Sequence, residues 1–318
     1  MAAGARTDSE RGVSGERQHL TSLAYRLLGS LTEAEDAVQE TYARWYGLSP
    51  RQRQDVAVPA AWLTTVAGRI CLDLLRSARV RRERYVGAWL PEPLPGAGEG
   101  SGHAADGADP ADRVALDESV HMAFLVLLES VTPAERVAFV LHDVFRYSFA
   151  EIADVVGRTP AACRQLAASA RRRVRAAQPD PATDPNAPAT PNTPAAAAVP
   201  AARQAALIKE FQQAWKAKDI AALVGLLDPG AVMTTDGGGL AGANARPVEG
   251  GERIAQYLAH FVDRAPGLAL EVRTVNGQPG LVARHAGATV SVAAFAFTGD
   301  GRISDIWTVR NPEKLTAW

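Results

Sequence analysis

Apolar side chains recur every three or four positions through most of the first 175 residues, and this spacing predicts amphipathic helices rather than strands. We expect helices at 19–28, 32–46, 59–84, 112–130, 132–144, 148–156 and 159–175. Three of them begin with a capping box, in which a Ser or Thr is followed three residues later by Glu: Thr32 with Glu35, Thr132 with Glu135, and Ser148 with Glu151. The N-terminal half is therefore predicted to be all-α.

The last two of these helices are spaced as a helix-turn-helix. Gly157 supplies a left-handed stop after the first helix, and Thr159 and Pro160 are suited to begin the second. On the second helix Cys163, Leu166, Ala167, Ala170 and Val174 share an inward face. The outer face and the residues flanking it supply the candidate DNA contacts, which are Thr159, Arg164, Gln165, Arg172 and Arg173.

The chemistry of that outer face fits duplex DNA. Gln pairs well with adenine and Arg with guanine in the major groove, and residues 158–178 hold six Arg and no acidic residue. The alternative is an ordinary helical hairpin with a solvated basic face.

The helix at 59–84 carries a second stripe of aromatic, cationic and polar side chains. Such a stripe suits unstacked bases and a phosphate backbone, although Trp62 is equally compatible with a core position. The candidate contacts are Trp62, Arg69, Asp73 and Arg76. The helix at 32–46 has an acidic outer face that is either solvated or a docking surface for a basic partner.

Composition divides the chain. Residues 1–17 are expected to form a flexible tail, and the stretches at 93–111 and 179–202, rich in Pro, Ala or Gly, are expected to be linkers. The domains are then 18–92, 112–178 and 203–318. In the last domain, helices at 203–218, 220–227 and 251–264 accompany strands at 231–235, 268–275, 281–285, 289–297 and 303–309, an order that predicts an α+β cone over a curved sheet.

Charge and cysteine content narrow the class of protein. The net charge is −1, so the basic features are local. Cys71 and Cys163 both fall at apolar helical positions, which favours a reducing cytoplasm without a disulfide or zinc framework. The sequence shows neither a long apolar run nor a signal peptide, and we expect a cytoplasmic protein that needs no metal or cofactor.

The helices at 32–46, 62–84 and 132–175 resemble the two domains of the extracytoplasmic-function sigma factors. The resemblance implies that region 2 binds core RNA polymerase through the helix at 32–46, and that region 2 and the helix-turn-helix of region 4 read the −10 and −35 elements of promoter DNA. It places the polymerase contacts at Glu33, Asp36, Gln39 and Glu40.

Three further motifs are similar to those of a subgroup that carries an extra C-terminal SnoaL-like domain. They are the Tyr85–Pro93 segment, Asp236-Gly237-Gly238-Gly239 and Asn311-Pro312-Glu313-Lys314-Leu315. Ala88 stands where proline is usual and Leu240 where lysine is usual. The resemblance implies regulation by this extension in place of a separate anti-sigma protein. A small-molecule or protein effector of the C-terminal domain is a further candidate partner. The regulatory contacts would be Tyr85, Trp89, Pro91 and all residues of the latter two motifs.

Two other functions fit parts of the pattern. A cone domain can be an isomerase or hydrolase, with Asp236, His285 and Asp305 as candidate acid or base groups, although no spacing fixes their mutual geometry. The helix-turn-helix is also compatible with a dimeric repressor that binds its operator without polymerase.

Overall fold

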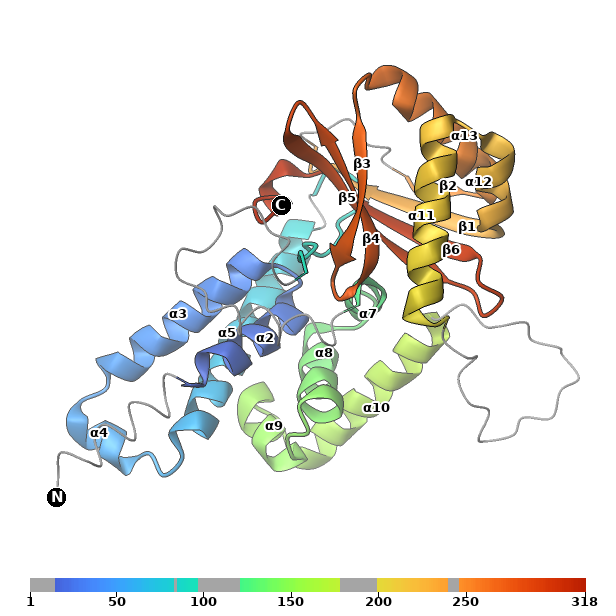
Figure 1. Cartoon of the computed structure of the whole chain (residues 1–318). Coiled ribbons are helices and arrows are strands. Elements are labelled where there is room, and N and C mark those ends of the chain that lie inside the picture. The colour runs from blue at the N-terminus through green and yellow to red at the C-terminus, as the bar shows by residue number, and fades with distance from the viewer. Residues whose placement is uncertain (1–14, 83–84, 97–120, 178–198, 240–245) are drawn as a thin grey trace, which may run out of the picture. The chain divides into compact units, whose positions relative to one another are not determined.

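The computed structural model describes residues 15–82, 85–96, 121–177, 199–239 and 246–318 (Figure 1). The chain divides into two compact units. The first comprises residues 1–84 and 125–178, and the second comprises residues 85–124 and 179–318.

The described part of the first unit is helical, as the apolar periodicity predicts. Its elements are α2 (Arg17–Leu28), α3 (Leu31–Gly47), α4 (Pro50–Asp55), α5 (Pro59–Arg82), α8 (Pro133–Phe139), the π-helical turn η1 (Val140–Val144), α9 (Phe149–Val156) and α10 (Pro160–Ala177). The helix α7 (Met122–Leu128) passes from the second unit into the first, and the rest of the helix expected at 112–130 lies outside the described residues on its N-terminal side.

Two local predictions in this unit were wrong. Ser30, not Thr32, caps α3, because its extended backbone lets its hydroxyl accept the N–H of Glu33 at 3.3 Å. The short helix α4 was not expected, since none of its side chains is buried and it therefore has no apolar stripe. The capping boxes at Thr132 and Ser148 are both confirmed.

The two groups of helices in this unit pack against each other. Gly68 of α5 lies against Val155 of α9, where an added Cβ would come within 2.7 Å of a Val155 methyl carbon. The buried guanidinium of Arg136 in α8 donates to Leu27 O at 2.9 Å and to Leu128 O at 3.0 Å, so it satisfies carbonyls at the ends of α2 and α7. Regions expected to form separate bundles therefore share one packed unit.

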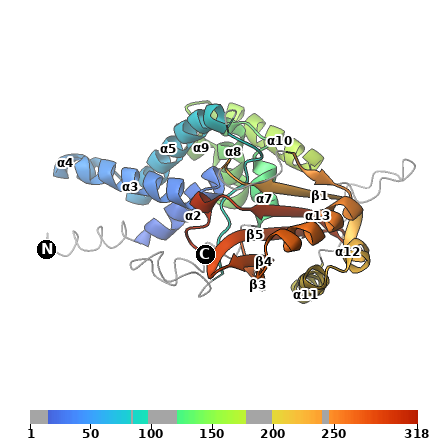
Figure 2. The same ribbon diagram turned by 90° about the horizontal axis from the view of Figure 1, so that it is seen from above.

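The second unit is an α+β cone, as predicted. Helices α11 (Ala201–Ala217), α12 (Ile220–Leu226) and α13 (Gly251–Arg264) accompany a six-stranded sheet (Figure 2). The strands are β1 (Leu227–Asp236), β2 (Val248–Glu249), β3 (Ala269–Val275), β4 (Gln278–His285), β5 (Ala288–Phe297) and β6 (Ile303–Val309), in the order β2-β1-β6-β5-β4-β3. Only β1 and β6 run parallel. On α11 Leu207, Ile208 and Phe211 are buried, whereas Ala206 is exposed.

The segment after α5 belongs to this cone, which moves the domain boundary predicted at residue 92. Pro95 forms a bridge with Val275 on β3, and the N–H of Asn276 donates to Leu94 O at 2.9 Å. The indole N–H of Trp318 donates to Pro93 O at 2.9 Å. The start of the stretch expected to be a linker therefore adds to the sheet edge, because its backbone finds hydrogen-bond partners there. Residues 97–111 and 179–198 of the expected linkers, and Leu240, lie outside the described residues.

Candidate functional site

The helix-turn-helix is built as its sequence indicates. The N–H of Gly157 donates to Ala153 O at 2.9 Å with a left-handed backbone (φ 70°), which ends α9. The Thr159 hydroxyl accepts the N–H of Ala162 at 3.2 Å and begins α10. Cys163, Ala167, Ala170 and Val174 are buried and Leu166 is partly buried, so the inward face of α10 is confirmed.

The proposed base-reading side chains stand outward on α10. Thr159, Arg164, Gln165 and Arg172 are exposed. The guanidinium carbon of Arg164 lies 5.3 Å from the centre of the Phe149 ring, an arrangement that holds the side chain at the start of the helix. Arg173 is also exposed, but its guanidinium lies 3.6 Å from the buried carboxylate of Glu135, so it has a structural partner in α8.

One residue of the candidate stripe on α5, Arg69, contacts the helix-turn-helix. Nε and Nη2 of Arg69 donate to Asp154 O in α9 at 3.0 and 2.7 Å, a favourable place for a cation near a helix C-terminus. Trp62 is half-buried and packs on Trp45 at 5.2 Å between ring centres, whereas Asp73 and Arg76 are exposed and pair with each other at 3.1 Å. A cleft within this unit runs between α5 and α9 and is lined by Trp62 and Arg69, among others.

A tyrosine fixes the start of the helix-turn-helix, and no pattern in the sequence pointed to its partners. The Tyr147 hydroxyl lies 2.9 Å from Nε2 of His19 and 3.1 Å from Oγ1 of Thr64. The π-helical turn before it and the left-handed Arg146 (φ 64°) set its position. Burial raises the pKa of Tyr147 and lowers the pKa of His19.

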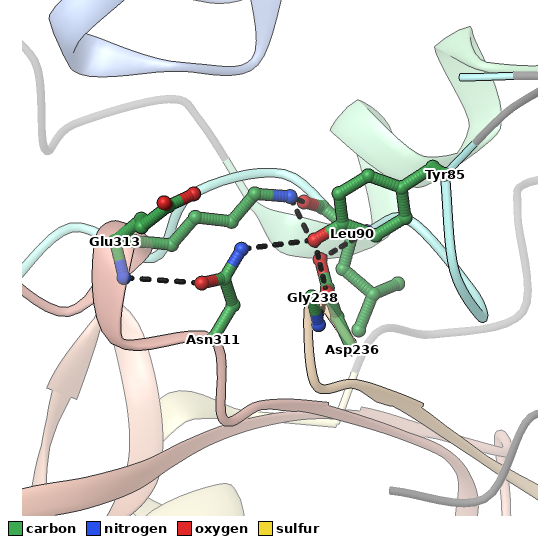
Figure 3. Close-up of polar contacts among 7 residues, drawn as sticks. Tyr85, Leu90, Asp236, Gly238, Asn311 and Glu313 are labelled. Atoms are coloured by element: carbon green, nitrogen blue, oxygen red, sulfur yellow. Dashed lines mark hydrogen bonds and ion pairs between the residues drawn. The ribbon is translucent and has the colours of Figure 1, made fainter. Parts of the chain in front are cut away.

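The three subgroup motifs meet in the second unit, at a buried carboxylate (Figure 3). Oδ1 of Asp236 accepts the Tyr85 hydroxyl at 2.6 Å and the Gly238 N–H at 3.0 Å, while Oδ2 accepts the Leu90 N–H at 2.9 Å. The Asn311 amide donates to the Tyr85 hydroxyl at 2.9 Å. We call Tyr85, Leu90, Asp236, Gly238, Asn311 and Lys314 the Asp236 cluster.

Lys314 supplies the cation for this carboxylate. Its Nζ lies 2.7 Å from Oδ2 of Asp236, donates to Leu90 O at 2.5 Å, and lies 4.2 Å from the centre of the Trp89 ring. The ammonium is thus held by a carboxylate, a carbonyl and an aromatic face, which together offset the cost of burying the ion pair. Burial, helped by the hydrogen bond to Asp236, raises the pKa of Tyr85.

The remaining motif residues shape the two loops around the cluster. Gly238 and Gly239 have left-handed backbones (φ 61° and 75°), and an added Cβ on Gly238 would come within 2.5 Å of the Asn311 side chain. Asn311 caps the 3-10 turn η2 (Pro312–Lys314) by accepting the Glu313 N–H at 3.1 Å. Gly237, Pro91 and Leu315 are buried, whereas the side chains of Pro312 and Glu313 are exposed.

Three family descriptions match the sequence in the same order as the structural parts. Sigma-70 region 2 matches residues 13–81, sigma-70 region 4 matches residues 121–174, and the SnoaL-like domain matches residues 208–318. The ECF RNA polymerase sigma factor SigJ of Mycobacterium tuberculosis is 38% identical over 315 residues, which cover 94% of this chain and 91% of that protein. The chain belongs to the extracytoplasmic-function sigma factors.

Further comparisons agree with this assignment. The probable ECF RNA polymerase sigma factor SigI of Mycobacterium tuberculosis is 33% identical over 303 residues, covering 94% of this chain and 92% of that one. The crystal structure of Mycobacterium tuberculosis SigJ superposes with a TM-score of 0.70 at 35% identity, covering 95% of this chain and 96% of that chain. The α2 to α5 bundle of this sigma factor is thus region 2, and the α9 to α10 pair lies in region 4.

The acidic face of region 2 is where the sequence placed it. Asp36, Gln39 and Glu40 are exposed on α3, and Glu33 is partly buried next to the Ser30 cap. Glu40 forms an exposed ion pair with Arg44 at 2.9 Å. Such a pair contributes little to folding, so the face is available for a partner.

The candidate acid and base groups of the cone do not converge. Asp236 is committed to the Asp236 cluster, and His285 is exposed at the end of β4. Ile306, the next residue on β6, points into the cone. Because side chains alternate along a strand, Asp305 points to the opposite face of the sheet, where burial raises its pKa. Among the described residues, none of the three lines the cavity inside the cone.

Neither a membrane span nor a metal centre is present in the described part of the chain. No helix there is both long and apolar enough to cross a membrane. No group of three or more His, Cys, Asp or Glu residues there is arranged to hold a metal ion. Cys71 and Cys163 are both free and buried, and burial raises the pKa of Cys71 to about 12.

Proposed function

We propose that this sigma factor directs core RNA polymerase to promoters, and that its own C-terminal domain restrains it through the Asp236 cluster. The observation that carries the proposal is the anchoring of Tyr85 and Leu90 on Asp236 and Lys314. Only two residues of sequence, Glu83 and Arg84, separate this segment from the end of α5. A contact made in the cone therefore limits the freedom of the chain that leaves α5.

A side-chain contact made by α5 supports the proposal that the sigma factor is restrained. The Arg69 side chain, a candidate −10 contact, is engaged with Asp154 O of α9. Before it can meet promoter DNA, that hydrogen-bonded contact must open. We infer that promoter binding uses Trp62, Arg69, Asp73 and Arg76 in region 2 and Thr159, Arg164, Gln165 and Arg172 in region 4, and that core polymerase binds the acidic face of α3.

In this proposal the C-terminal domain is a regulator rather than a catalyst. The buried carboxylate of Asp236 accepts hydrogen bonds from Tyr85, Leu90 and Gly238 and a fourth, charged one from Lys314, so it has a structural role. The other two acid or base candidates are apart from it and from each other.

Run-off transcription with core polymerase tests the proposal. Asp236→Asn and Lys314→Met should each raise the initial rate severalfold, because each weakens the hold on the Tyr85–Pro93 segment. Lys209→Met, which removes an exposed lysine on α11, is the matched control and should leave the rate unchanged. An unchanged or lower rate with folded Asp236→Asn protein would contradict restraint by this cluster. A nanomolar footprint by the free protein at physiological salt would instead favour a polymerase-independent repressor.

A further inference from the structure

A second feature of the cone is an internal cavity next to the Asp236 cluster. Aromatic and aliphatic side chains form most of its wall, including Phe211 and Trp215 of α11, Tyr257 and Phe261 of α13, and Phe295 of β5. The cavity has an empty volume of about 480 Å³, which includes its opening to solvent. The centre of a water molecule fits into only about 30 Å³ of this volume. The cavity is thus a narrow slot, which suits a thin apolar chain better than a bulky ligand.

The polarity of the slot changes along the strands. On β1, Met233 is followed on the same face by Thr235, and on β6 Ile306 is followed by Thr308. Ala293 pairs with Thr308, so continuing two residues along each strand brings Ser291 beside Arg310. One end of the cavity is therefore apolar, and the other is a polar strip formed by Thr235, Ser291, Thr308 and Arg310.

Two groups in this strip are unusual for a folded core. The Thr308 hydroxyl belongs to a residue that is only 6% exposed, and among the described residues it has no hydrogen-bond partner. Arg310 is the only charged side chain among the described residues that line the cavity, and its guanidinium carbon lies 4.9 Å from the centre of the Phe261 ring.

We propose that the cone binds a straight-chain apolar carboxylate, with its chain in the slot and its head group at Thr308 and Arg310. A carboxylate can accept the Thr308 O–H and charge-assisted hydrogen bonds from the guanidinium, which a neutral head group cannot match. The apolar wall supplies the rest of the affinity through burial of the chain. The site is separate from the acid and base candidates, and it requires no chemical step.

The cavity and the Asp236 cluster share backbone. The N–H groups of Arg310 and Asn311 donate to Asp236 O at 2.7 and 3.1 Å. Arg310 therefore contributes to the cavity with its side chain, and its main chain holds the residue that anchors Tyr85. That a bound carboxylate would alter transcription rests on the proposed function, whereas binding itself does not.

Binding to the full chain tests this inference by isothermal titration calorimetry, without polymerase. Hexanoate, octanoate and decanoate should bind one per chain, with affinity rising about fourfold per added methylene group, the equivalent of about 0.8 kcal/mol. Decanamide, the neutral analogue, should bind at least tenfold more weakly than decanoate. Arg310→Gln should weaken decanoate at least tenfold, while Arg302→Gln, an exposed arginine in the β5–β6 turn, should bind as the parent does.

Thr308→Val is the second variant, because valine keeps the shape of the site and tests the hydroxyl even if Arg310→Gln fails to fold. It should weaken decanoate severalfold and leave the free protein at least as stable. Absence of saturable decanoate binding would overturn the inference, as would equal binding of decanamide or binding that Thr308→Val leaves unchanged. None of these outcomes affects the transcription test of the Asp236 cluster, which uses no ligand.

Discussion

The Tyr85 hydroxyl donates a 2.6 Å hydrogen bond to Asp236, a residue 151 positions later in the chain. It also accepts the Asn311 amide, so one phenol group joins all three motifs of the C-terminal unit. Removal of this half-buried hydroxyl, which has two such partners, is therefore expected to lower the stability of the unit.

Tyr85→Phe should lower the free energy of unfolding of the cone unit by about 1–3 kcal/mol, because Asp236 loses a donor and Asn311 an acceptor while the ring remains. Urea denaturation followed by tryptophan fluorescence measures the change. Tyr46→Phe, at an exposed ring, is the control and should be neutral. Equal stability of the two variants would show that this hydrogen bond contributes nothing measurable.

The close approach of Gly238 to Asn311 leads to a second prediction. Gly238→Ala and Gly267→Ala both place a Cβ on a left-handed backbone, with φ of 61° and 83°, but only the first meets another side chain. Gly238→Ala should therefore destabilise the protein by clearly more than the roughly 1 kcal/mol expected for the backbone term alone. Thermal unfolding of both variants measures the difference. If both lose the same stability, the loop and Asn311 adjust freely to each other.

Sequence patterns predicted the helices and strands more reliably than the contacts between distant residues. The helices of region 4 follow from caps and apolar spacing that lie within a few residues, as at Ser148 and Gly157. The start of α3 was misassigned because Thr32 and Ser30 are both good caps and only the local backbone decides between them. Leu94 was assigned to a linker because its neighbours are Pro and Gly, yet its N–H finds the Asn276 side chain 182 positions away.

The same distinction holds for the candidate site. The resemblance to a subgroup identified the motif residues Tyr85, Asp236 and Asn311, but it did not indicate which of their atoms would meet. Lys314 reaches Asp236 across 78 positions, and Arg69 reaches Asp154 O across 85. No local pattern encodes such pairs, because they depend on how the whole chain packs.

The second helix of the helix-turn-helix, α10, gives a third prediction. If Arg164 and Gln165 touch base edges, each change to Ala should cost about 1–3 kcal/mol in promoter binding and relax preference at one upstream position. Arg172→Ala should weaken all promoters alike, since a phosphate contact carries no sequence information. Holoenzyme binding to a panel of promoter variants measures both effects. Uniform losses for all three changes would contradict the assignment.

Arg173 is a less suitable probe than Arg172. Its ion pair with the buried carboxylate of Glu135 means that Arg173→Ala would perturb α8 as well as any phosphate contact. Burial alone would raise the pKa of Glu135, but hydrogen bonds from Ser169 and Thr132 and the charge of Arg173 outweigh it and hold that pKa low.

The half-buried histidine of region 2, His19, gives a pH-dependent prediction. Burial lowers the pKa of His19, so the folded protein keeps this ring neutral while the unfolded chain protonates with a pKa of about 6.5. As the pH falls below about 7, the unfolded state takes up the extra proton, and stability declines until the pH passes the folded pKa. Urea unfolding between about pH 7.5 and pH 5 should therefore show a shallower decline for His19→Gln than for the parent. His260→Gln, at an exposed ring, should follow the parent curve, and a His19→Gln curve parallel to it would rule out this linkage.

The acidic face of α3 gives the last prediction. Asp36 and Glu40 are exposed, and the Glu40–Arg44 pair has about half of each side chain in solvent (51% and 53%), so it contributes under about 1 kcal/mol to folding. The double reversal Asp36→Lys with Glu40→Lys should therefore leave the melting temperature nearly unchanged. If this face meets a basic surface of core polymerase, the same change replaces attraction with repulsion and should reduce affinity at least tenfold, with a weaker effect at high salt. Titration of labelled sigma factor with core polymerase measures this, and Glu210→Lys on α11, an exposed acid that also has an arginine partner, is the control. Full assembly by the folded double variant would show that the face is merely solvated, and polymerase binding would then have to use another surface of region 2.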